Sequence, residues 1–509
     1  MTSFVSVLDQ HARSQPNKEA LRAQGRTWTY AELADASRRA AAVLRDLGMG
    51  SGDRVAVLCL NTPGFIFTLF GAWRLGAVVV PVNHKLQAPE IEYILAHSNA
   101  TLCVFDAALA DTVRKIDRPG TTWVATDRPV PGRPFLEDLL DAVAPLTQQA
   151  PDEEDLAEVL YTSGTTGRPK GCLHSHRNVF QSALSVAAAT AIARDERMLI
   201  AMPAWHSSPL NNWLLGALLM GGTVVLLREY APQPFLETLA SERITFTFGA
   251  PIAFLAPLAA VPDVSAYDLS AMRVWAYGGG PLGADMARKL AAAYRSDRFI
   301  QVYGMTETGP SGVCLYPEDA IAKAGSIGRV AAPGVAIEVR HPDGRPCVAG
   351  EVGEIHMRSP AMMQGYLDDP DATASAFDAQ GWYRSGDLAR VDEDGFLYIV
   401  DRLKDMIVTG GENVYSKEVE DAISAWRGVQ DVAVIGRPHP EWGETVTAVL
   451  VPRTGSTIDV EELRNFLNER LARYKVPRLF EVRDALPRTA TGKLLKHMIR
   501  REDARDAAH

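Results

Sequence analysis

Short runs of apolar, mostly β-branched residues alternate along the chain with stretches in which apolar residues recur every three or four positions. The runs lie at residues 54–60, 77–82, 223–227, 244–248 and 273–277. They are continuously apolar, which is typical of strands that are covered on both faces. Strands that alternate with helices predict an α/β fold with layered, largely parallel sheets.

One helix start is well marked. Thr29 and Glu32 have the spacing of a capping box, and the apolar residues that follow recur at helical intervals. They are Leu33, Ala36, Ala40, Val43, Leu44 and Leu47.

The pattern changes twice in the second half of the chain. After about residue 325, frequent Gly and Pro separate short alternating strands, with a turn at Pro342-Asp343-Gly344, and this predicts a small β-barrel-like unit. Near Asp401 a charged and then glycine-rich segment precedes about a hundred residues of α+β pattern. Since 509 residues are too many for one core, we expect a large domain over 1–400 and a small α+β domain over 405–509.

Composition narrows the class of function. The chain is 47% hydrophobic and 22% charged, with a formal net charge of −10 and a mean hydropathy of −0.05. These values are ordinary for a globular protein, and the acidic balance argues against a nucleic-acid binder. Small-molecule chemistry is the remaining expectation.

The cysteines and the amino terminus bear on location. Five scattered cysteines without CxxC spacing fit a reducing compartment and neither a disulfide framework nor a zinc site. The first residues lack a basic region followed by an apolar run. The most apolar stretch, residues 65–82, is interrupted by Arg74, Gly76 and Pro81, so it predicts a helix and a buried strand instead of a membrane span. We therefore expect a cytoplasmic protein without a membrane span.

The segment YTSGTTGRPKG at residues 161–171 is the first candidate for chemistry. It follows an apolar strand, and its glycines and hydroxyls supply donors that could converge on a phosphate. It departs from the P-loop pattern because Arg-Pro separates Gly167 from Lys170 and no Ser or Thr follows the lysine. A plain surface loop is the competing interpretation.

Six further motifs follow this segment in order. They lie at residues 203–213, 277–283, 301–310, 382–390, 395–420 and 487–496. With these motifs the chain resembles the adenylate-forming (AMP-binding) superfamily, and within it the acyl- and aryl-CoA ligases. The resemblance implies that a carboxylic acid reacts with ATP to give acyl-AMP and pyrophosphate, and that the acyl group then passes to coenzyme A. ATP, Mg²⁺ and coenzyme A are thus the implied cofactors and partners.

The resemblance assigns the nucleotide contacts. Glu307 is the implied Mg²⁺ carboxylate, as suits a hard cation that bridges phosphates, and Thr306 the implied α-phosphate contact. Asp387 would accept the ribose hydroxyls, Arg402 would reach the ribose or α-phosphate, and Tyr303 with Ile399 would border the adenine. The remaining implied ATP or AMP contacts are Thr162, Ser163, Gly164, Thr165, Thr166, Gly167, Lys170, Gly278, Gly279, Gly280 and Gly304.

The carboxyl-terminal motifs carry the other implied roles. Lys493 would bridge the substrate carboxylate and the α-phosphate during adenylation, where a mobile ammonium stabilises the transition state. Lys404, within the expected hinge at 401–404, would let the small domain rotate, and Gly410, Gly411 and Glu412 would then line a tunnel for the thiol.

The acid pocket is the least defined part. The resemblance places it at His206, Asn211, Tyr277, Gly279, Gly304 and Met305. We expect His206 to act as a gate between the acid and the thiol, with a general base as the alternative. Asn211 and Asn212 could bond to a substituted acid or cap a helix, and Gly280, where alanine is common, could widen the pocket. His174 and His176 are expected to open the next helix instead of binding a metal.

Other functions remain to be compared with the acid–thiol ligase. An adenylate-forming enzyme that transfers the acyl group to an amine would carry the same motifs. A luciferase-like oxygenase, a domain that loads a carrier protein and a nucleotide-binding protein without activity are less favoured. Intact Lys493, Glu307 and Asp387 speak against the last of these. The sequence alone does not define the acid or the oligomeric state.

Overall fold

A computed structural model gives the structure of residues 3–116, 118–147, 150–162, 169–488 and 494–500. The chain forms two compact units, one of Met1–Ile337 with Met357–Arg384 and one of Glu338–His356 with Ser385–His509. These units are called the large and the small unit below. The hinge expected at 401–404 and the domain limits drawn on either side of it stay predictions.

The large unit contains a mixed sheet whose strands all lie within the described residues. Its order is β15 (Val330–Ala331), β14 (Val313–Leu315), β13 (Phe299–Tyr303), β12 (Val274–Tyr277), β11 (Phe246–Gly249), β9 (Arg197–Ile200), β10 (Thr223–Leu226), β1 (Glu19–Ala23) and β2 (Arg26–Thr29). The strands from β13 through β1 pair in parallel. This is called the first sheet.

A second sheet of the large unit is also mostly parallel. Its order is β18 (Gly365–Tyr366), β8 (Lys170–Ser175), β7 (Leu156–Thr162), β4 (Val78–Pro81), β3 (Arg54–Leu58), β5 (Leu102–Asp106) and β6 (Thr122–Thr126). The apolar runs of the sequence are thus confirmed as strands of these two sheets, paired in parallel as predicted.

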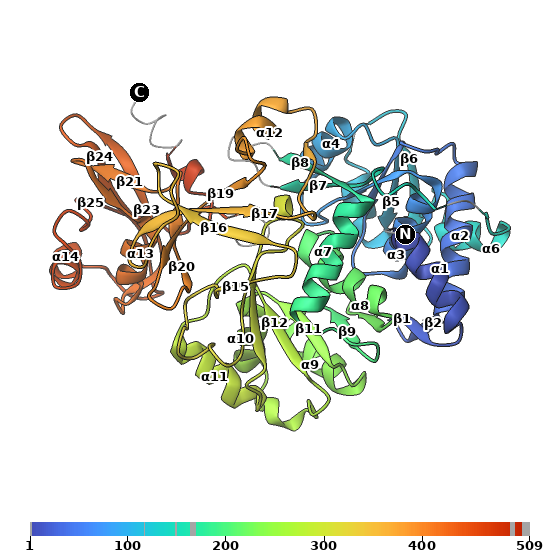
Figure 1. The fold of residues 1–509 in the computed structure, drawn as a ribbon, viewed down its shortest axis with the longest axis horizontal. Helices are drawn as coiled ribbons and strands as arrows, with labels where there is room; N and C mark the ends of the chain where they lie inside the picture. The colour runs from blue at the N-terminus through green and yellow to red at the C-terminus, as the bar shows by residue number, and fades with distance from the viewer. Residues whose placement is uncertain (1–2, 117, 148–149, 163–168, 489–493, 501–509) are drawn as a thin grey trace. The chain divides into compact units, whose positions relative to one another are not determined.

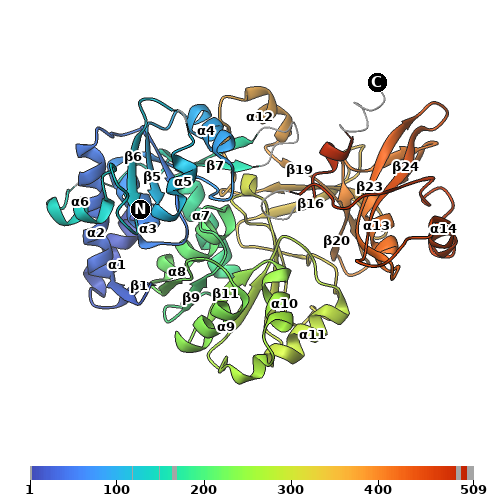
Figure 2. The same cartoon turned by 180° about the vertical axis from the view of Figure 1, so that it is seen from behind.

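Helices fill the layers around the two sheets, as Figures 1 and 2 show. One core joins both sheets through α1 (Phe4–Ser14), α2 (Tyr30–Asp46), α3 (Pro63–Leu75), α7 (His176–Ala189) and α8 (Leu215–Met220). The other face of the second sheet packs on α4 (Ala88–His97), with η1 (Ala107–Leu109) and α5 (Ala110–Val113) beside it, and the other face of the first sheet packs on α9 (Pro232–Ser241), α10 (Pro251–Ala260) and α11 (Ala284–Tyr294). The remaining short helices of this unit are α6 (Leu136–Ala142), η2 (Ser208–Leu214), η3 (Val264–Ala266), η4 (Thr306–Thr308) and α12 (Pro370–Ala376).

Strand β3 shows why its sequence lacks alternation. Val55 and Val57 pack into the core between the sheets, whereas Ala56 and Leu58 pack into the core on the other face. Because both faces are covered, each residue of the strand gains by being apolar. The capping box at Thr29 and Glu32 is likewise confirmed, with both hydrogen bonds present at the start of α2.

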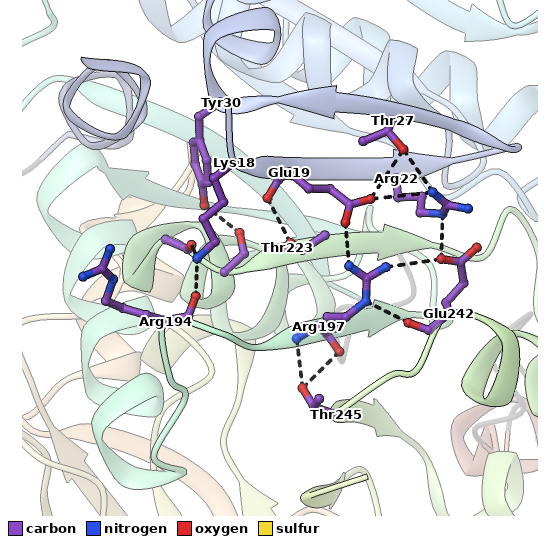
Figure 3. Close-up of polar contacts among 12 residues, drawn as sticks. Lys18, Glu19, Arg22, Thr27, Tyr30, Arg194, Arg197, Thr223, Glu242 and Thr245 are labelled. Carbon is purple, nitrogen blue, oxygen red and sulfur yellow. Dashed lines mark hydrogen bonds and ion pairs between the residues drawn. The ribbon is translucent and has the colours of Figure 1, made fainter. Parts of the chain in front are cut away.

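A set of ion pairs fastens the amino-terminal hairpin to the first sheet (Figure 3). Arg197 at the start of β9 contacts Glu19 of β1 at 2.5 Å and Glu242 at 3.2 Å, and Arg22 contacts Glu242 at 2.6 Å. The hollow beside them, lined in part by Arg243 and Thr245, lies at the amino-terminal ends of the parallel strands. Arg22 and Arg197, which line this hollow, are already paired with glutamates. We therefore interpret the hollow as part of the structural packing and not as a binding site.

The small unit is built on two further sheets. The first joins β16 (Ala336–Arg340), β17 (Val352–Arg358), β19 (Tyr383–Val391) and β20 (Leu397–Arg402) in a row that has β16 and β20 at its ends among the described residues. It is the β-rich stretch that the sequence predicts, but its described strands form an open row and not the expected barrel-like unit, since β16 and β20 do not pair. The predicted turn closes where Gly344 N donates to His341 O. Its strands β16, β17 and β19 begin or end in the large unit.

The other sheet of the small unit is covered by helices, which gives this part of the chain the α+β character that the sequence predicts. It joins β22 (Glu412–Val414), β21 (Ile407–Thr409), β24 (Gly443–Pro452) and β23 (Val429–His439), and β25 (Leu479–Val482) pairs with β24. Helices α13 (Ser416–Ser424) and α14 (Val460–Asn468) pack on it. Within the described part of the chain, no helix is long and apolar enough to cross a membrane.

Candidate functional site

Three of the predicted motifs follow neighbouring strands of the first sheet. Strands β13, β12, β11 and β9 are adjacent and parallel, so their carboxyl ends lie at one edge. Residues 203–214 come after β9, residues 278–280 after β12 and residues 304–308 after β13. This edge is where open parallel sheets bind ligands, and the structure therefore brings these motifs together.

The glycines after β12 are not equivalent. A Cβ on Gly278 would lie 2.9 Å from Val302 O, and Gly279 has a φ of +82°, so close backbone approach and a left-handed conformation require glycine at both positions. A Cβ on Gly280 would meet nothing within 4 Å. Tyr277, the last residue of β12, is buried.

The segment after β13 carries the two polar residues expected at the phosphates. Tyr303 ends the strand, and Gly304 is required because a Cβ there would lie 2.4 Å from Pro310 O. Met305 precedes the short helix η4, whose first two residues are Thr306 and Glu307. Glu307 is 8% exposed, so it is largely buried at this edge of the sheet and does not lie on an open surface.

Glu307 is held by residues that the sequence motifs did not point to. The hydroxyl of Tyr366 donates to Glu307 Oε1 at 3.1 Å, and Met363 N donates to Glu307 O at 2.9 Å. Burial and the nearby Glu307 carboxylate raise the pKa of Tyr366, so its hydroxyl stays a donor. The contact depends on the pairing of β18 with β8, which no local pattern around Tyr366 predicts.

The predicted phosphate segment joins two antiparallel strands. Thr162 ends β7, Lys170 begins β8, and the two residues are register partners. Lys170 Nζ lies 3.2 Å from Asp369 Oδ2 and 5.0 Å from the ring centroid of Tyr366. The segment thus lies near Glu307, which the sequence places 137 residues later. Its remaining predicted contacts lie outside the described residues: Ser163, Gly164, Thr165, Thr166 and Gly167.

The segment after β9 carries the expected acid-side residues. Asn61 fixes it, because the Asn61 side chain accepts from Ala204 N at 2.8 Å and donates to Met202 O at 3.0 Å. His206 is exposed, yet the protein around it lowers its pKa by desolvation. Ser207 Oγ lies 2.9 Å from Thr306 Oγ1, so the acid-side and phosphate-side motifs meet here.

A fully buried polar cluster connects this segment to β7 and β8. Asn211 of η2 donates to Glu158 Oε1 at 2.6 Å, and His174 is the register partner of Glu158 across β7 and β8. Burial raises the pKa of Glu158 to about 7 and lowers that of His174 to about 4, against a smaller opposite effect of the Thr306 backbone on His174. Near neutral pH His174 is therefore uncharged, and the Glu158 carboxyl is about half protonated.

The two asparagines of η2 are therefore engaged within the protein. Asn211 is paired with Glu158, and Asn212 donates to Pro310 O at 3.0 Å and accepts from Ser182. Neither side chain caps the helix, because the residue before η2 makes no side-chain cap bond and both asparagines lie inside it. A contact between Asn211 and the acid stays a prediction. His176 is the first residue of α7, and Ser175 caps that helix, as expected.

In the small unit, Asp387 and Arg402 face each other. Asp387 of β19 and Arg402 of β20 are register partners, with Arg402 Nε 3.0 Å from Asp387 Oδ1. Asp387 is 5% exposed and lies within a strand, so the alternative of a simple turn aspartate is wrong. Ile399, half-buried on β20, pairs with Ala389. The geometry is compatible with ribose binding by Asp387, which stays a prediction.

The predicted thiol loop is a tight hairpin. Gly410 and Gly411 connect β21 to β22, with φ of +60° and +84°. Two consecutive left-handed residues define a type I′ turn, so the hairpin itself requires both glycines. Glu412 begins β22 and is exposed. Lys404 lies in the turn after β20, and partial burial lowers its pKa.

Lys493 lies outside the described residues. Just beyond it, Lys496 Nζ donates to Ser416 Oγ at 2.6 Å and lies 2.7 Å from Glu420 Oε1. Asp401 accepts from the hydroxyl of the same Ser416 at 3.0 Å. The chain that follows Lys493 is thereby tied to the segment in which the hinge is expected.

The described residues hold no group of three or more His, Cys, Asp or Glu that could bind a metal by themselves. Glu307 nevertheless fits a magnesium ion that arrives with a nucleotide. Mg²⁺ is commonly bound through one or two carboxylates, with phosphate oxygens and water completing its shell.

Comparisons with known proteins agree with this geometry. Residues 8–367 match the family of AMP-binding enzymes, and residues 418–493 match the AMP-binding enzyme C-terminal domain. A feruloyl-CoA synthase from an Amycolatopsis species is 41% identical over 498 residues, which cover 96% of this chain and 97% of that one. The long-chain-fatty-acid–CoA ligase FadD13 of Mycobacterium tuberculosis is 36% identical and covers 93% of both chains. The structure of O-succinylbenzoate coenzyme A synthetase (MenE) from Bacillus subtilis with ATP and a magnesium ion has a TM-score of 0.84 at 30% identity, over 96% of this chain and 98% of that chain.

Proposed function

The chain belongs to the family of AMP-binding enzymes, and from this premise we propose that it joins a carboxylic acid to coenzyme A using ATP. In the first step a carboxylate oxygen attacks the α-phosphorus of ATP, which gives acyl-AMP and pyrophosphate. In the second step the thiol of coenzyme A attacks the acyl carbon, the thiol proton is lost and AMP leaves. Acid activation is needed because a free carboxylate is a poor electrophile.

The contact between Ser207 and Thr306 carries this proposal. It joins the acid-side segment to the phosphate-side segment at a distance of 2.9 Å, so an acid bound next to His206 would lie near the α-phosphate contact. A reaction between two anions needs this proximity together with charge neutralisation. Lys170 and Thr162 on the neighbouring hairpin supply donors for the outer phosphates.

The remaining groups take the roles that the motifs imply. Glu307 would hold the magnesium ion, which neutralises phosphate charge when it is bound. Asp387 and Arg402 would hold the ribose, and Lys493 would bridge the acid and the α-phosphate. Rotation of the small domain about Lys404 would then exchange Lys493 for the hairpin at 410–411. A cytoplasmic location agrees with the cysteine pattern of the sequence.

We propose an aryl carboxylic acid as the substrate class. Support comes from the 41% identity to a feruloyl-CoA synthase, and a fatty acid is the alternative raised by the 36% identity to FadD13. In this chain the amides of Asn211 and Asn212 are turned to protein partners. An acid with an apolar ring therefore fits the side of the pocket formed by η2 better than an acid that needs hydrogen bonds from both amides.

The test is ATP–pyrophosphate exchange over aryl, fatty and short-chain acids, with product mass measured with and without coenzyme A. We expect exchange with aryl acids and a thioester product only when coenzyme A is present. An amide or other product lacking coenzyme A, when coenzyme A and amines are both supplied, would favour the amide-forming alternative.

A variant separates the two steps. Lys493→Ala is expected to abolish acyl-AMP formation and to leave thioester formation from supplied acyl-AMP intact. Loss of both half-reactions in a folded variant would contradict the role of Lys493 in adenylation alone.

A further inference from the structure

One short segment of the large unit, residues 361–369, holds the loop that carries Glu307. Gly309 has a φ of +65°, and a Cβ there would lie 2.3 Å from Ala361 O, so the two backbones are in close contact. Met363 N donates to Glu307 O at 2.9 Å. Tyr366 Oη donates to Glu307 Oε1 at 3.1 Å. The segment thus contacts both the backbone and the carboxylate of Glu307.

The same segment holds the lysine of the phosphate hairpin. Lys170 Nζ lies 3.2 Å from Asp369 Oδ2 and 5.0 Å from the ring centroid of Tyr366. A cation over an aromatic face is attracted by the ring, and the attraction increases when water is partly excluded. Lys170 retains 22% of its side-chain exposure. Tyr366 therefore contacts Glu307 through its hydroxyl and Lys170 through its ring.

Tyr366 is itself firmly placed. It pairs with Cys172 across β18 and β8, and its backbone N–H donates to Thr373 Oγ1 at 2.9 Å. Thr373 in turn donates to Asp369 O at 2.9 Å. The position of the Tyr366 ring is fixed by the hydrogen bonds of its backbone and by the first turn of α12. The ring can therefore hold the charged side chains of Glu307 and Lys170 in place.

We propose that Tyr366 is a positioning residue that orients the Glu307 carboxylate for the magnesium ion of the nucleotide and the Lys170 ammonium for its phosphates. The inference rests on the proposed function, in which Glu307 binds the metal and Lys170 the phosphates. A hydroxyl that donates to Oε1 fixes the rotation of the carboxylate and so aims the other oxygen. Partners of this kind typically contribute about 10- to 100-fold to metal affinity.

The test uses two substitutions that remove different parts of Tyr366. Tyr366→Phe removes the hydroxyl and keeps the ring, whereas Tyr366→Leu removes both. ATP binding to the full chain is measured by calorimetry over a series of magnesium concentrations. We expect Tyr366→Phe to raise the magnesium concentration for half-maximal ATP affinity about tenfold. Tyr366→Leu should also weaken ATP binding without magnesium, about threefold, because Lys170 loses its support.

Tyr230→Phe is the matched control. Its hydroxyl also donates within the large unit, to Ala253 O at 2.8 Å, and Tyr230 has no part in the proposed site. We expect its magnesium dependence to equal that of the parent chain. The KM for the acid should stay unchanged in Tyr366→Phe, since no acid-side residue is altered, and this separates positioning from a general loosening of the fold.

Two results would overturn the inference. One is a Tyr366→Phe chain whose magnesium dependence equals that of Tyr230→Phe. The other is an equal loss of ATP and acid affinity with a lowered melting temperature, which indicates a structural role. Glu307→Gln distinguishes a failure of the proposed metal site from a failure of the role of Tyr366. If magnesium dependence persists in Glu307→Gln, the proposed metal site itself fails; if it is lost there but kept in Tyr366→Phe, only the role of Tyr366 fails.

Discussion

Two glutamates of the large unit, Glu307 and Glu158, have different surroundings. The Glu307 region comprises Glu307, Tyr366 and Lys170; the Glu158 region comprises Glu158, His174 and Asn211. Glu307 is 8% exposed and accepts a hydrogen bond from the Tyr366 hydroxyl, and Lys170 lies over the ring of that tyrosine. Glu158 is fully buried, and the Asn211 amide is its hydrogen-bond partner within the described residues. One carboxylate can meet a cation, and the other is enclosed by protein.

The difference shows how two carboxylates of the same unit can serve different purposes. In the Glu158 region burial raises the pKa of the carboxyl to about 7, so the acid that supports the helix with the acid-side residues is protonated well above the pH at which an exposed glutamate ionises. A buried charge without a partner would be costly there. In the Glu307 region the Tyr366 hydroxyl donates to the carboxylate, and Lys170 lies over the ring of the same tyrosine, which suits a group that binds a metal with its phosphates.

The largest effect is expected from Glu307→Gln. The amide keeps the shape of the side chain and removes its charge, so the magnesium ion loses its protein carboxylate. ATP–pyrophosphate exchange should fall about 1,000-fold at saturating acid, since groups that neutralise charge in the transition state contribute about 100- to 1,000-fold each. Glu158→Gln measured in parallel should retain exchange within about fivefold. Equal losses in both variants would remove the distinction between the two regions.

A second prediction concerns stability and pH. The pKa of Glu158 rises from 4.5 to about 7 on folding, so the folded chain binds a proton more tightly than the unfolded one. Its stability contribution is therefore complete below about pH 4.5 and is lost as the pH rises to about 7. The shift corresponds to about 3 kcal/mol. Glu158→Gln removes this dependence, and its melting temperature relative to the parent should rise between pH 5 and pH 8.

The control for this pH series is Glu237→Gln. Glu237 is an exposed residue of α9 that accepts a hydrogen bond from Gln233 of the same helix. Its melting temperature should differ from the parent by the same small amount at every pH. If the difference in melting temperature between Glu158→Gln and the parent is equally independent of pH, Glu158 stays charged in the folded protein.

The sequence predicts much of this arrangement because its signals are local. Continuous apolar runs such as residues 54–60 and 273–277 predict buried parallel strands, and the structure confirms them. Motifs that follow those strands must gather at the carboxyl edge once the strands are parallel. The sequence therefore places Thr306, Glu307 and His206 at the same edge.

The residues that the sequence did not predict depend on pairings between distant segments. Tyr366 reaches Glu307 because β18 pairs with β8, and these strands are almost two hundred residues apart. Glu158 gives a weak signal, a single acidic residue within the apolar run LAEVLY. Its partner Asn211 cannot be identified locally, since η2 approaches β7 only through tertiary packing. In the sequence Gly410 and Gly411 indicate a loop, and their φ values show that a hairpin turn requires them.

The third prediction tests whether the Glu158 region supports the acid side. Asn211→Ala leaves the buried Glu158 carboxyl without its donor, at a cost of about 1–3 kcal/mol in stability. Helix η2 should loosen, and the KM for the acid should rise about tenfold while the KM for ATP stays constant. Asn212→Ala provides a comparison, because Asn212 bonds to Pro310 and Ser182 instead. A rise in the KM for ATP that matches the rise for the acid would contradict a role confined to the acid side.

The smallest effect is expected where the two regions meet. Ser207→Ala removes the 2.9 Å contact between Ser207 Oγ and Thr306 Oγ1, which is worth about 1 kcal/mol, so exchange should fall about fivefold. Thr306→Val removes the same contact together with the expected α-phosphate contact and should have the larger effect.

A double-mutant cycle gives the decisive comparison for this contact. If Ser207 acts by orienting the Thr306 hydroxyl, adding Ser207→Ala to Thr306→Val should cause no further loss. Additive losses would mean that Ser207 acts on the acid directly. The acid-side and phosphate-side residues would then be neighbours without being coupled, and the support that this contact gives to a shared site would be withdrawn.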